Sequence, residues 1–79
     1  MGIDHLITHL AEALEIAPGT ITQETTSEMI EEWDSLGQIS ILSRLDLVYN
    51  EITEKAPELA SAVSVVEIYT ILKNHGVLD

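Results

Sequence analysis

The 79-residue sequence is short enough for one small domain, which we expect over residues 1–79, and it is acidic and aliphatic. Asp and Glu number 14 against 3 Lys and Arg, so the formal net charge is −11. This charge excludes nucleic acid and anionic membranes as partners, because both would repel the surface, and it predicts that any charged partner is basic. Hydrophobic residues make up 46% of the chain, which is enough for a small core and too many for a disordered tail.

The chain contains no cysteine, which excludes disulfides, thiolate zinc sites and cysteine nucleophiles and suits a reducing compartment. No apolar run approaches the roughly 20 residues that span a bilayer. The N-terminus lacks the charged and then apolar pattern of a signal peptide. We therefore expect a cytoplasmic protein without membrane insertion.

A first helix is predicted over residues 4–16, with Asp4 at its N-cap and Pro18-Gly19 after its end. Its apolar residues recur at three- and four-residue steps, as in a helix with one buried face: Ile3, Leu6, Ile7, Leu10 and Leu14. The spacing therefore predicts that this helix packs on one side only.

Residues 17–34 form a long polar connection that contains apolar anchors at Ile21 and at Met29-Ile30. A connection of this length is uncommon in a compact domain and is often functional. No shift in composition elsewhere marks a second domain.

A second helix is predicted over residues 36–52, because apolar residues form one stripe along it: Leu36, Ile39, Leu42, Leu45, Val48, Tyr49 and Ile52. Ile41 and Leu47 fall outside this stripe. Two interpretations follow. Either the helix is buried on more than one side, or these two side chains form an apolar surface for a partner.

A short helical turn is predicted over residues 57–60 and a last helix over residues 64–74. Ser64 and Glu67 have the spacing of a capping box, and Gly76 is well placed for the turn after the helix. Val65, Val66, Ile68, Tyr69 and Leu72 are expected on its inner side. The predicted fold is all-α: a small four-helix bundle of antiparallel type, with three long helices, one short one and a long first loop.

Few residues are spaced for metal binding or catalysis. His5 and His9 lie four residues apart with Glu12 near the same face, but no further ligand has a defined spacing, so we predict no metal site. Four serines lack a neighbouring base in the sequence: Ser27, Ser35, Ser40 and Ser43. We therefore predict no catalytic residue and no enzyme activity.

The segment over residues 31–37, Glu-Glu-Trp-Asp-Ser-Leu-Gly, ends the acidic loop and opens the second helix. Asp34 and Ser35 are both good N-caps, and Ser35 with Gln38 matches a capping box, so a structural interpretation is available. A serine at a helix start is also exposed near the positive helix end. That position suits a covalently attached phosphate.

From about Ile3 to Gly76, the chain resembles the acyl carrier proteins. The resemblance lies in Asp34-Ser35-Leu36 after a long loop, the Leu-rich helix behind it, and the Ser64-Val65 start of the last helix. It implies an acyl-carrier-like fold in which Ser35 takes a 4′-phosphopantetheine arm from coenzyme A through a phosphodiester. The terminal thiol of the arm would hold an acyl or aminoacyl group as a thioester.

The resemblance also implies roles for the neighbours of Ser35. Asp34 would orient the modifying enzyme or its metal-bound coenzyme. Leu36 would pack at the helix start and contact partners. The implied partners are a phosphopantetheinyl transferase, an acyl-loading ligase or synthase, and acyltransferases, with the chain itself a monomer.

The sequence departs from the fatty-acid type of this family along the second helix. Gly37, Ser40, Leu47 and Val48 stand where acids are common, and Trp33 stands where a small residue is usual. This pattern looks more like stand-alone carriers of lipid, polyketide or other specialised pathways, which a dedicated ligase or transferase loads. We therefore expect partners to meet acidic residues ahead of the serine and apolar residues on the helix: Glu31, Glu32, Ile41 and Leu47.

Two other functions stay open at this point. An unmodified acidic helical adaptor that docks a basic protein surface fits the composition and charge equally well. A small hydrolase that uses Ser35 would need a base brought close by the fold.

Overall fold

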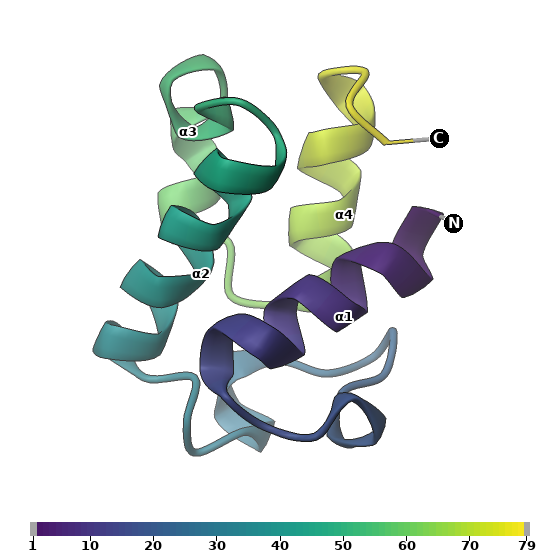
Figure 1. The fold of residues 1–79 in the computed structure, drawn as a ribbon, viewed down its shortest axis with the longest axis vertical. Helices are drawn as coiled ribbons and strands as arrows, with labels where there is room; N and C mark the ends of the chain where they lie inside the picture. Colours follow the sequence, from purple (N-terminus) through teal and green to yellow (C-terminus); the bar gives the residue numbers. More distant parts are fainter. Residues whose placement is uncertain (1, 79) are drawn as a thin grey trace.

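The protein structure is a computed structural model that describes residues 2–78 (Figure 1). Its helices follow in chain order as α1 (Gly2–Leu14), η1 (Pro18–Thr20), η2 (Ser27–Met29), α2 (Ser35–Val48), α3 (Ile52–Lys55), η3 (Pro57–Ser61) and α4 (Val65–Asn74), where η marks a 3-10 helix. No strand forms over the described range, so the prediction of an all-α domain with three long helices, one short one and a long first loop is confirmed. None of the helices over residues 2–78 has the length and apolarity that a bilayer span needs.

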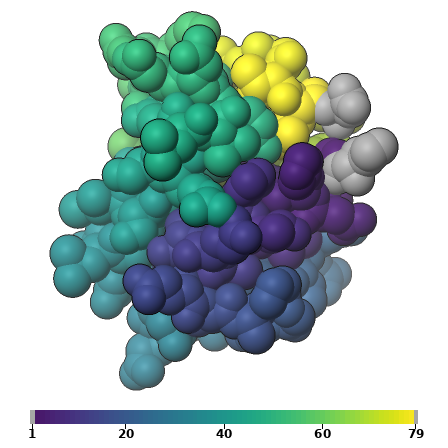
Figure 2. Space-filling view, viewed as in Figure 1, coloured from purple at the N-terminus to yellow at the C-terminus, as the bar shows by residue number. Residues whose placement is uncertain are grey.

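The three long helices surround one aliphatic core. In Figure 1, α2 and α4 run in the same direction, and the chain returns between them through α3 and η3. The prediction of an antiparallel-type arrangement is therefore wrong for this pair, because two short elements carry the chain back. The slanted α1 makes its most extensive contact with α2, and the two helices meet across the face seen in Figure 2.

The first helix begins earlier and ends earlier than predicted. It already includes Gly2, so Asp4 lies within the first turn instead of at the N-cap. The helix ends at Leu14, because Glu15 adopts a left-handed conformation with φ of 58°. Its apolar face is confirmed: Leu6, Leu10, Ala11 and Leu14 are buried, with Ile3 and Ile7 packed against them.

The buried face of α2 differs from the predicted stripe. Ile41, which lies outside that stripe, is fully buried together with Leu45, whereas Leu36 is 75% exposed and Ile39 is 60% exposed. Apolar residues occur on every side of this helix, so the spacing of apolar residues alone does not determine which face is buried. The packing of α2 against α1 and η3 determines the buried face.

The second helix ends at Val48 and not at Ile52. Asn50 and Glu51 both have left-handed φ angles, of 57° and 58°, and the separate helix α3 follows. Asp46 fastens this corner, because its two carboxylate oxygens accept hydrogen bonds from the Thr53 N–H and hydroxyl, each at 2.9 Å. The carboxylate therefore caps the start of α3.

The last helix begins as predicted. Ser64 is its N-cap and accepts a hydrogen bond from the Glu67 N–H at 3.1 Å, while the Glu67 carboxylate accepts from the Ser64 hydroxyl at 3.2 Å. Val65, Ile68 and Leu72 are buried, but Val66 is 52% exposed, so its predicted inward position is wrong. Gly76 follows the helix with φ of 77°, a conformation that glycine adopts without a steric penalty.

The long loop is fastened to the start of α4. Thr26 forms an isolated antiparallel bridge with Ser64, in which the Ser27 N–H donates to the Val63 carbonyl at 2.8 Å and the Val65 N–H donates to the Thr25 carbonyl at 3.0 Å. Two of the predicted apolar anchors are buried, Ile21 and Ile30, whereas Met29 is exposed. The loop is thus a packed layer under the helices.

Gly37 lets the loop backbone lie directly against the first turn of α2. A methyl group at this position would overlap the Glu32 carbonyl oxygen and would lie 2.8 Å from a Leu14 methyl carbon. The glycine is itself buried. A side chain at this position would therefore push the loop away from the helix.

We predict that Gly37→Ala destabilises the protein by about 1–2 kcal/mol, because overpacking against the Glu32 backbone outweighs the helix propensity that alanine adds. Urea unfolding followed by circular dichroism measures the change. Gly19→Ala is the matched control, since an added methyl there meets no atom within 4 Å. A Gly37→Ala variant as stable as the parent would show that the loop can retreat without loss.

Candidate functional site

Ser35 is the first residue of α2, and its side chain is exposed. The N-cap role falls to Asp34, whose carboxylate accepts a hydrogen bond from the Gly37 N–H at 2.9 Å. The alternative capping box of Ser35 with Gln38 does not form, because the Gln38 side chain binds elsewhere. Within residues 2–78 the exposed Ser35 hydroxyl has no hydrogen-bond partner, so it takes no part in the helix cap.

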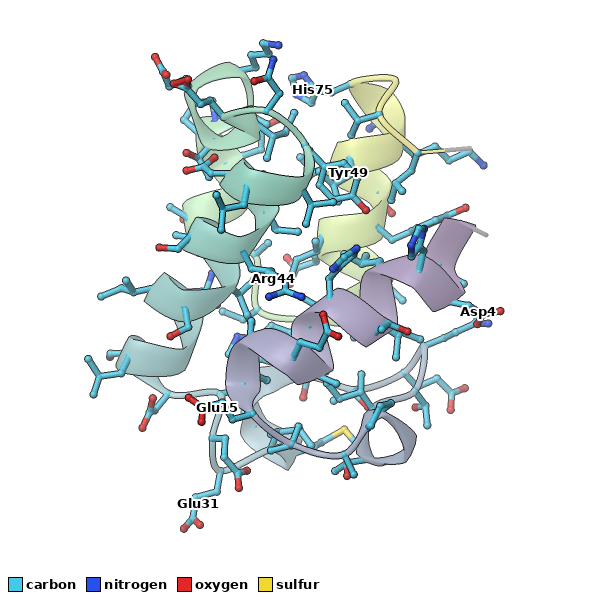
Figure 3. The ribbon with its side chains drawn as sticks, viewed as in Figure 1. Asp4, Glu15, Glu31, Arg44, Tyr49 and His75 are labelled. Atoms are coloured by element: carbon cyan, nitrogen blue, oxygen red, sulfur yellow. The ribbon has the colours of Figure 1, made fainter. Side chains whose placement is uncertain are left out.

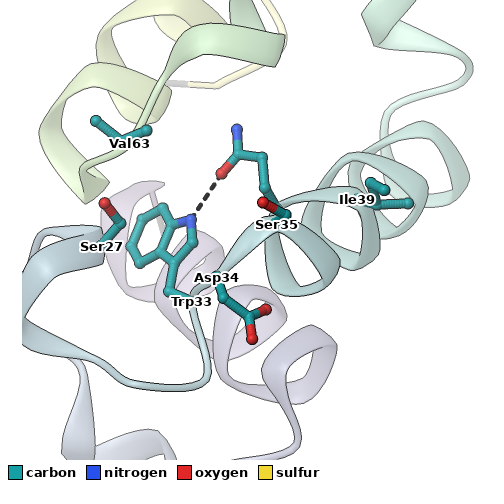
Figure 4. A pocket seen from close by; sticks show the side chains of 7 residues that line it. Ser27, Trp33, Asp34, Ser35, Ile39 and Val63 are labelled. Atoms are coloured by element: carbon teal, nitrogen blue, oxygen red, sulfur yellow. Dashed lines mark hydrogen bonds between the residues drawn. The ribbon is translucent and has the colours of Figure 1, made fainter.

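Gln38 joins the loop to η3 directly beside Ser35. Its side-chain oxygen accepts a hydrogen bond from the Trp33 indole N–H at 2.7 Å, drawn dashed in Figure 4. Its side-chain nitrogen donates to the Ala62 carbonyl at 2.9 Å and lies 3.3 Å from the carbonyl oxygens of Leu59 and Ala60. We call this arrangement the Gln38 clasp. It holds the buried Trp33 ring under the first turn of α2.

A groove of about 530 Å³ opens next to the clasp (Figure 4). It lies between the loop, the start of α2 and the chain that leads into α4. Its lining mixes apolar surface with hydroxyl, amide and carboxylate groups, from Ser27, Trp33, Asp34, Ser35, Gln38, Ile39 and Val63. A flexible group attached to the Ser35 hydroxyl would therefore find both apolar contacts and hydrogen-bonding groups within the same groove.

The end of the molecule that carries Ser35 is strongly acidic. Its exposed acids cluster just before the serine, at Glu28, Glu31, Glu32 and Asp34, and Glu31 points outward in Figure 3. No Lys or Arg occurs in residues 1–43. Arg44 is engaged with Glu12, and Lys73 stacks over the Tyr69 ring, 5.8 Å from its centroid. The field around Ser35 is therefore negative.

The two apolar residues predicted to contact a partner have different positions. Ile41 is fully buried, so its predicted role on a partner surface is wrong: it is a core residue between α1 and η3. Leu47 is 83% exposed and stays a candidate. Leu36 is 75% exposed, so its predicted packing at the helix start is wrong, and it stays a candidate for contact with partners. Ile39 and Val63, also exposed, give the groove apolar lining.

His5, His9 and Glu12 do not form a metal site. The described residues contain no group of three or more His, Cys, Asp or Glu that could hold a metal ion. Instead the two imidazole rings stack with centroids 5.1 Å apart, and Arg44 donates to Nδ1 of His9 at 3.5 Å while pairing with Glu12. These residues tie α1 to α2.

Five residues line the groove but are not among the site residues predicted from the sequence: Ser27, Trp33, Gln38, Ile39 and Val63. In the sequence, Gln38 has only the spacing of a capping box with Ser35, and Val63 precedes the Ser64 cap with no feature of its own. The spacing of Gln38 from Ser35, one helical turn, was the available signal that both side chains share a face.

No family model matches the chain, and neither a curated protein nor a solved structure matches it.

The position of His9 predicts a pH dependence of stability. Burial, with Arg44 and His5 nearby, lowers the pKa of His9 below its ordinary value of 6.5. Between that lowered pKa and 6.5 the unfolded chain binds more protons than the folded one, so this contribution to stability is present above pH 6.5 and is lost as the pH falls through the folded pKa. Replacing His9 with Asn should flatten the rise in urea midpoint from mildly acidic to neutral pH.

A proton NMR titration of the His9 ring tests the same prediction directly. We expect a midpoint below 6.5 in the folded protein. A midpoint at or above that value would mean that Glu12, whose carboxylate oxygen lies 3.8 Å from Nδ1 of His9, outweighs burial and Arg44.

Proposed function

We propose that the protein is a carrier that holds a 4′-phosphopantetheine arm on Ser35 and presents an acyl or aminoacyl group to partner enzymes. The observation that supports this most directly is the exposed Ser35 hydroxyl, which has no hydrogen-bond partner within the described residues and lies at the start of α2 beside an apolar-rimmed groove. The proposal places the chain in the cytoplasm as a monomer without catalytic residues of its own. When bound, the arm supplies the thiol that a chain without cysteine lacks.

The residues around Ser35 fit such an attachment. Backbone N–H groups in the first turn of a helix lack intrahelical partners, and the helix dipole favours negative charge there, so a phosphodiester on Ser35 is stabilised. Asp34 satisfies one of these N–H groups and leaves Ser35 unengaged. The groove offers the Ser27 hydroxyl and the apolar Ile39 and Val63 to an attached chain of mixed polarity.

Charge and exposed apolar surface support docking to basic partner enzymes. The acids ahead of Ser35 would attract a basic surface and speed the encounter. Leu36 and Leu47, both exposed on α2, would contribute apolar contacts that a partner buries. This combination fits the expected phosphopantetheinyl transferase and the loading ligase, synthase or acyltransferases.

A hydrolase that uses Ser35 has less support. Histidine is not among the residues that line the groove, and no described base lies within hydrogen-bond distance of the Ser35 hydroxyl. An unmodified adaptor would use the acidic surface but leaves the unengaged serine and its groove without a role. We therefore propose the carrier function over both.

We predict that a broad-specificity phosphopantetheinyl transferase and coenzyme A add one arm to the chain, on Ser35. Ser35→Ala should change the free energy of unfolding by less than about 0.5 kcal/mol, because Asp34 provides the cap and the replaced side chain is exposed. Intact-protein mass spectrometry should show no added mass on this variant.

Ser40→Ala is the matched control, since Ser40 is another exposed serine of α2. It should accept the arm as the parent does. A parent chain that stays unmodified would favour the adaptor, and a Ser35→Ala chain that is still modified would move the attachment to another residue.

We predict separable roles for charge and apolar contact in docking. Replacing both Glu31 and Glu32 with Gln should slow association with the loading enzyme and weaken its salt dependence, because both side chains are exposed in the acidic cluster. Leu47→Ala should instead speed dissociation. Stopped-flow binding at several salt concentrations separates the two rates, and an unchanged association rate of the Gln variant at low salt would contradict the role of the acids.

A further inference from the structure

We propose that the cargo of this carrier stays outside the helical core, because the protein closes both sides of the first turn of α2. The inference rests on the proposed function and deepens it by naming the cargo class. A cargo that is not buried in the core gains no free energy from burial of a long alkyl chain. We therefore expect a short or polar cargo, such as a small hydroxyacyl or aminoacyl group, that lies in the surface groove. Ser35 is the first residue of that turn, and α2 packs against α1 on one side and η3 on another.

The side facing α1 is closed by backbone. Gly37 is buried against the Glu32 carbonyl, and an added methyl would overlap that oxygen and press on Leu14. There is no room here even for one carbon atom. An alkyl chain would have to displace the loop backbone, which is itself bridged to the start of α4.

The side facing η3 is closed by the Gln38 clasp. One amide spans the seam between α2 and η3, with its nitrogen 2.9 Å from the Ala62 carbonyl oxygen and within 3.3 Å of two further carbonyl oxygens. The Trp33 ring, only 4% exposed, lies against the same amide through its 2.7 Å hydrogen bond. An entering chain would have to break these partly buried hydrogen bonds, which costs free energy.

The core behind the seam is shielded from solvent. Ile41 and Leu45 of α2 and Leu59 of η3 each have no exposed surface, and α2 packs against both η3 and α1. The gain from burying an alkyl chain grows with its length, so a short chain gains least against the broken clasp. The groove, in contrast, is open to a chain from Ser35 without any rearrangement.

The absence of cysteine provides a test that does not depend on enzymatic modification. Ser35→Cys creates a single thiol, to which iodoacetamides with an arm-length spacer and butyl, octyl or dodecyl chains ending in a trifluoromethyl group can be coupled. The fluorine solvent isotope shift between H₂O and D₂O reports whether the chain end lies in water. Because the groove is open to solvent, we expect the isotope shift to stay close to that of an exposed group, and the thermal midpoint to stay unchanged, for all three lengths.

A fluorine signal that loses its isotope shift as the chain lengthens, with a rising thermal midpoint, would contradict the proposal that both sides of the first turn of α2 are closed to the cargo. The clasp itself is tested with Gln38→Ala in the Ser35→Cys background, where the octyl and dodecyl ends should lose the isotope shift. Gln23→Ala is the matched control, because Gln23 is an exposed loop residue. A folded Gln38→Ala variant whose chains stay fully exposed would overturn the role of the clasp.

The two proposals fail in distinguishable ways. If Gln38→Ala does not fold, the measurements on the Ser35→Cys chain with its clasp intact still decide the position of the cargo. A native chain that the transferase does not modify overturns the carrier function. A chain end whose fluorine signal loses its isotope shift contradicts the proposal that the cargo stays outside the core, whether or not the native serine is modified.

Discussion

The first turn of α2 lies where three parts of the chain meet, and the side-chain amide of Gln38 is the group that joins them. Its oxygen accepts from Trp33 in the loop, and its nitrogen donates to carbonyls of the segment that leads into α4. An amide offers an acceptor and two donors at once, so one side chain satisfies polar groups from both neighbours. The opposite side of the turn needs no side chain, because Gly37 lets the Glu32 backbone close it. The position of Ser35 beside the groove follows from these two contacts.

In the same turn, the N-cap and the exposed hydroxyl belong to different residues, Asp34 and Ser35, although either residue could cap the helix on sequence grounds. Asp34 and Ser35 are both suitable N-caps, but the carboxylate of Asp34 takes the Gly37 N–H and leaves the serine hydroxyl exposed. A serine that capped its own helix would lose that hydrogen bond on modification and destabilise the helix start. Because the cap lies one residue earlier, a change to the Ser35 side chain would leave the Asp34 cap in place.

Local features of the chain could be predicted from the sequence, and contacts between distant segments could not. The cap of α4, in which Ser64 accepts from the Glu67 N–H and donates to the Glu67 carboxylate, needs only residues three apart, and it forms. The buried face of α2 depends on partners elsewhere in the chain, and for this reason Ile41 was misplaced on the surface. The Gln38 clasp reaches residues more than twenty positions away and has no local signature. The serine of the candidate site was therefore predictable, but the groove beside it was not.

The distribution of apolar residues links the fold to its proposed role. The core is closed, yet Leu36 and Ile39 lie exposed on the first turns of α2, beside the groove and within a negative field. Exposed apolar side chains gain nothing in the isolated chain, whereas a partner that covers them gains binding energy. If the chain is a carrier, as we propose, and its core stays closed to the cargo, the cargo is left in contact with water. The apolar surface around Ser35 is then the part of the chain that a partner enzyme would bury.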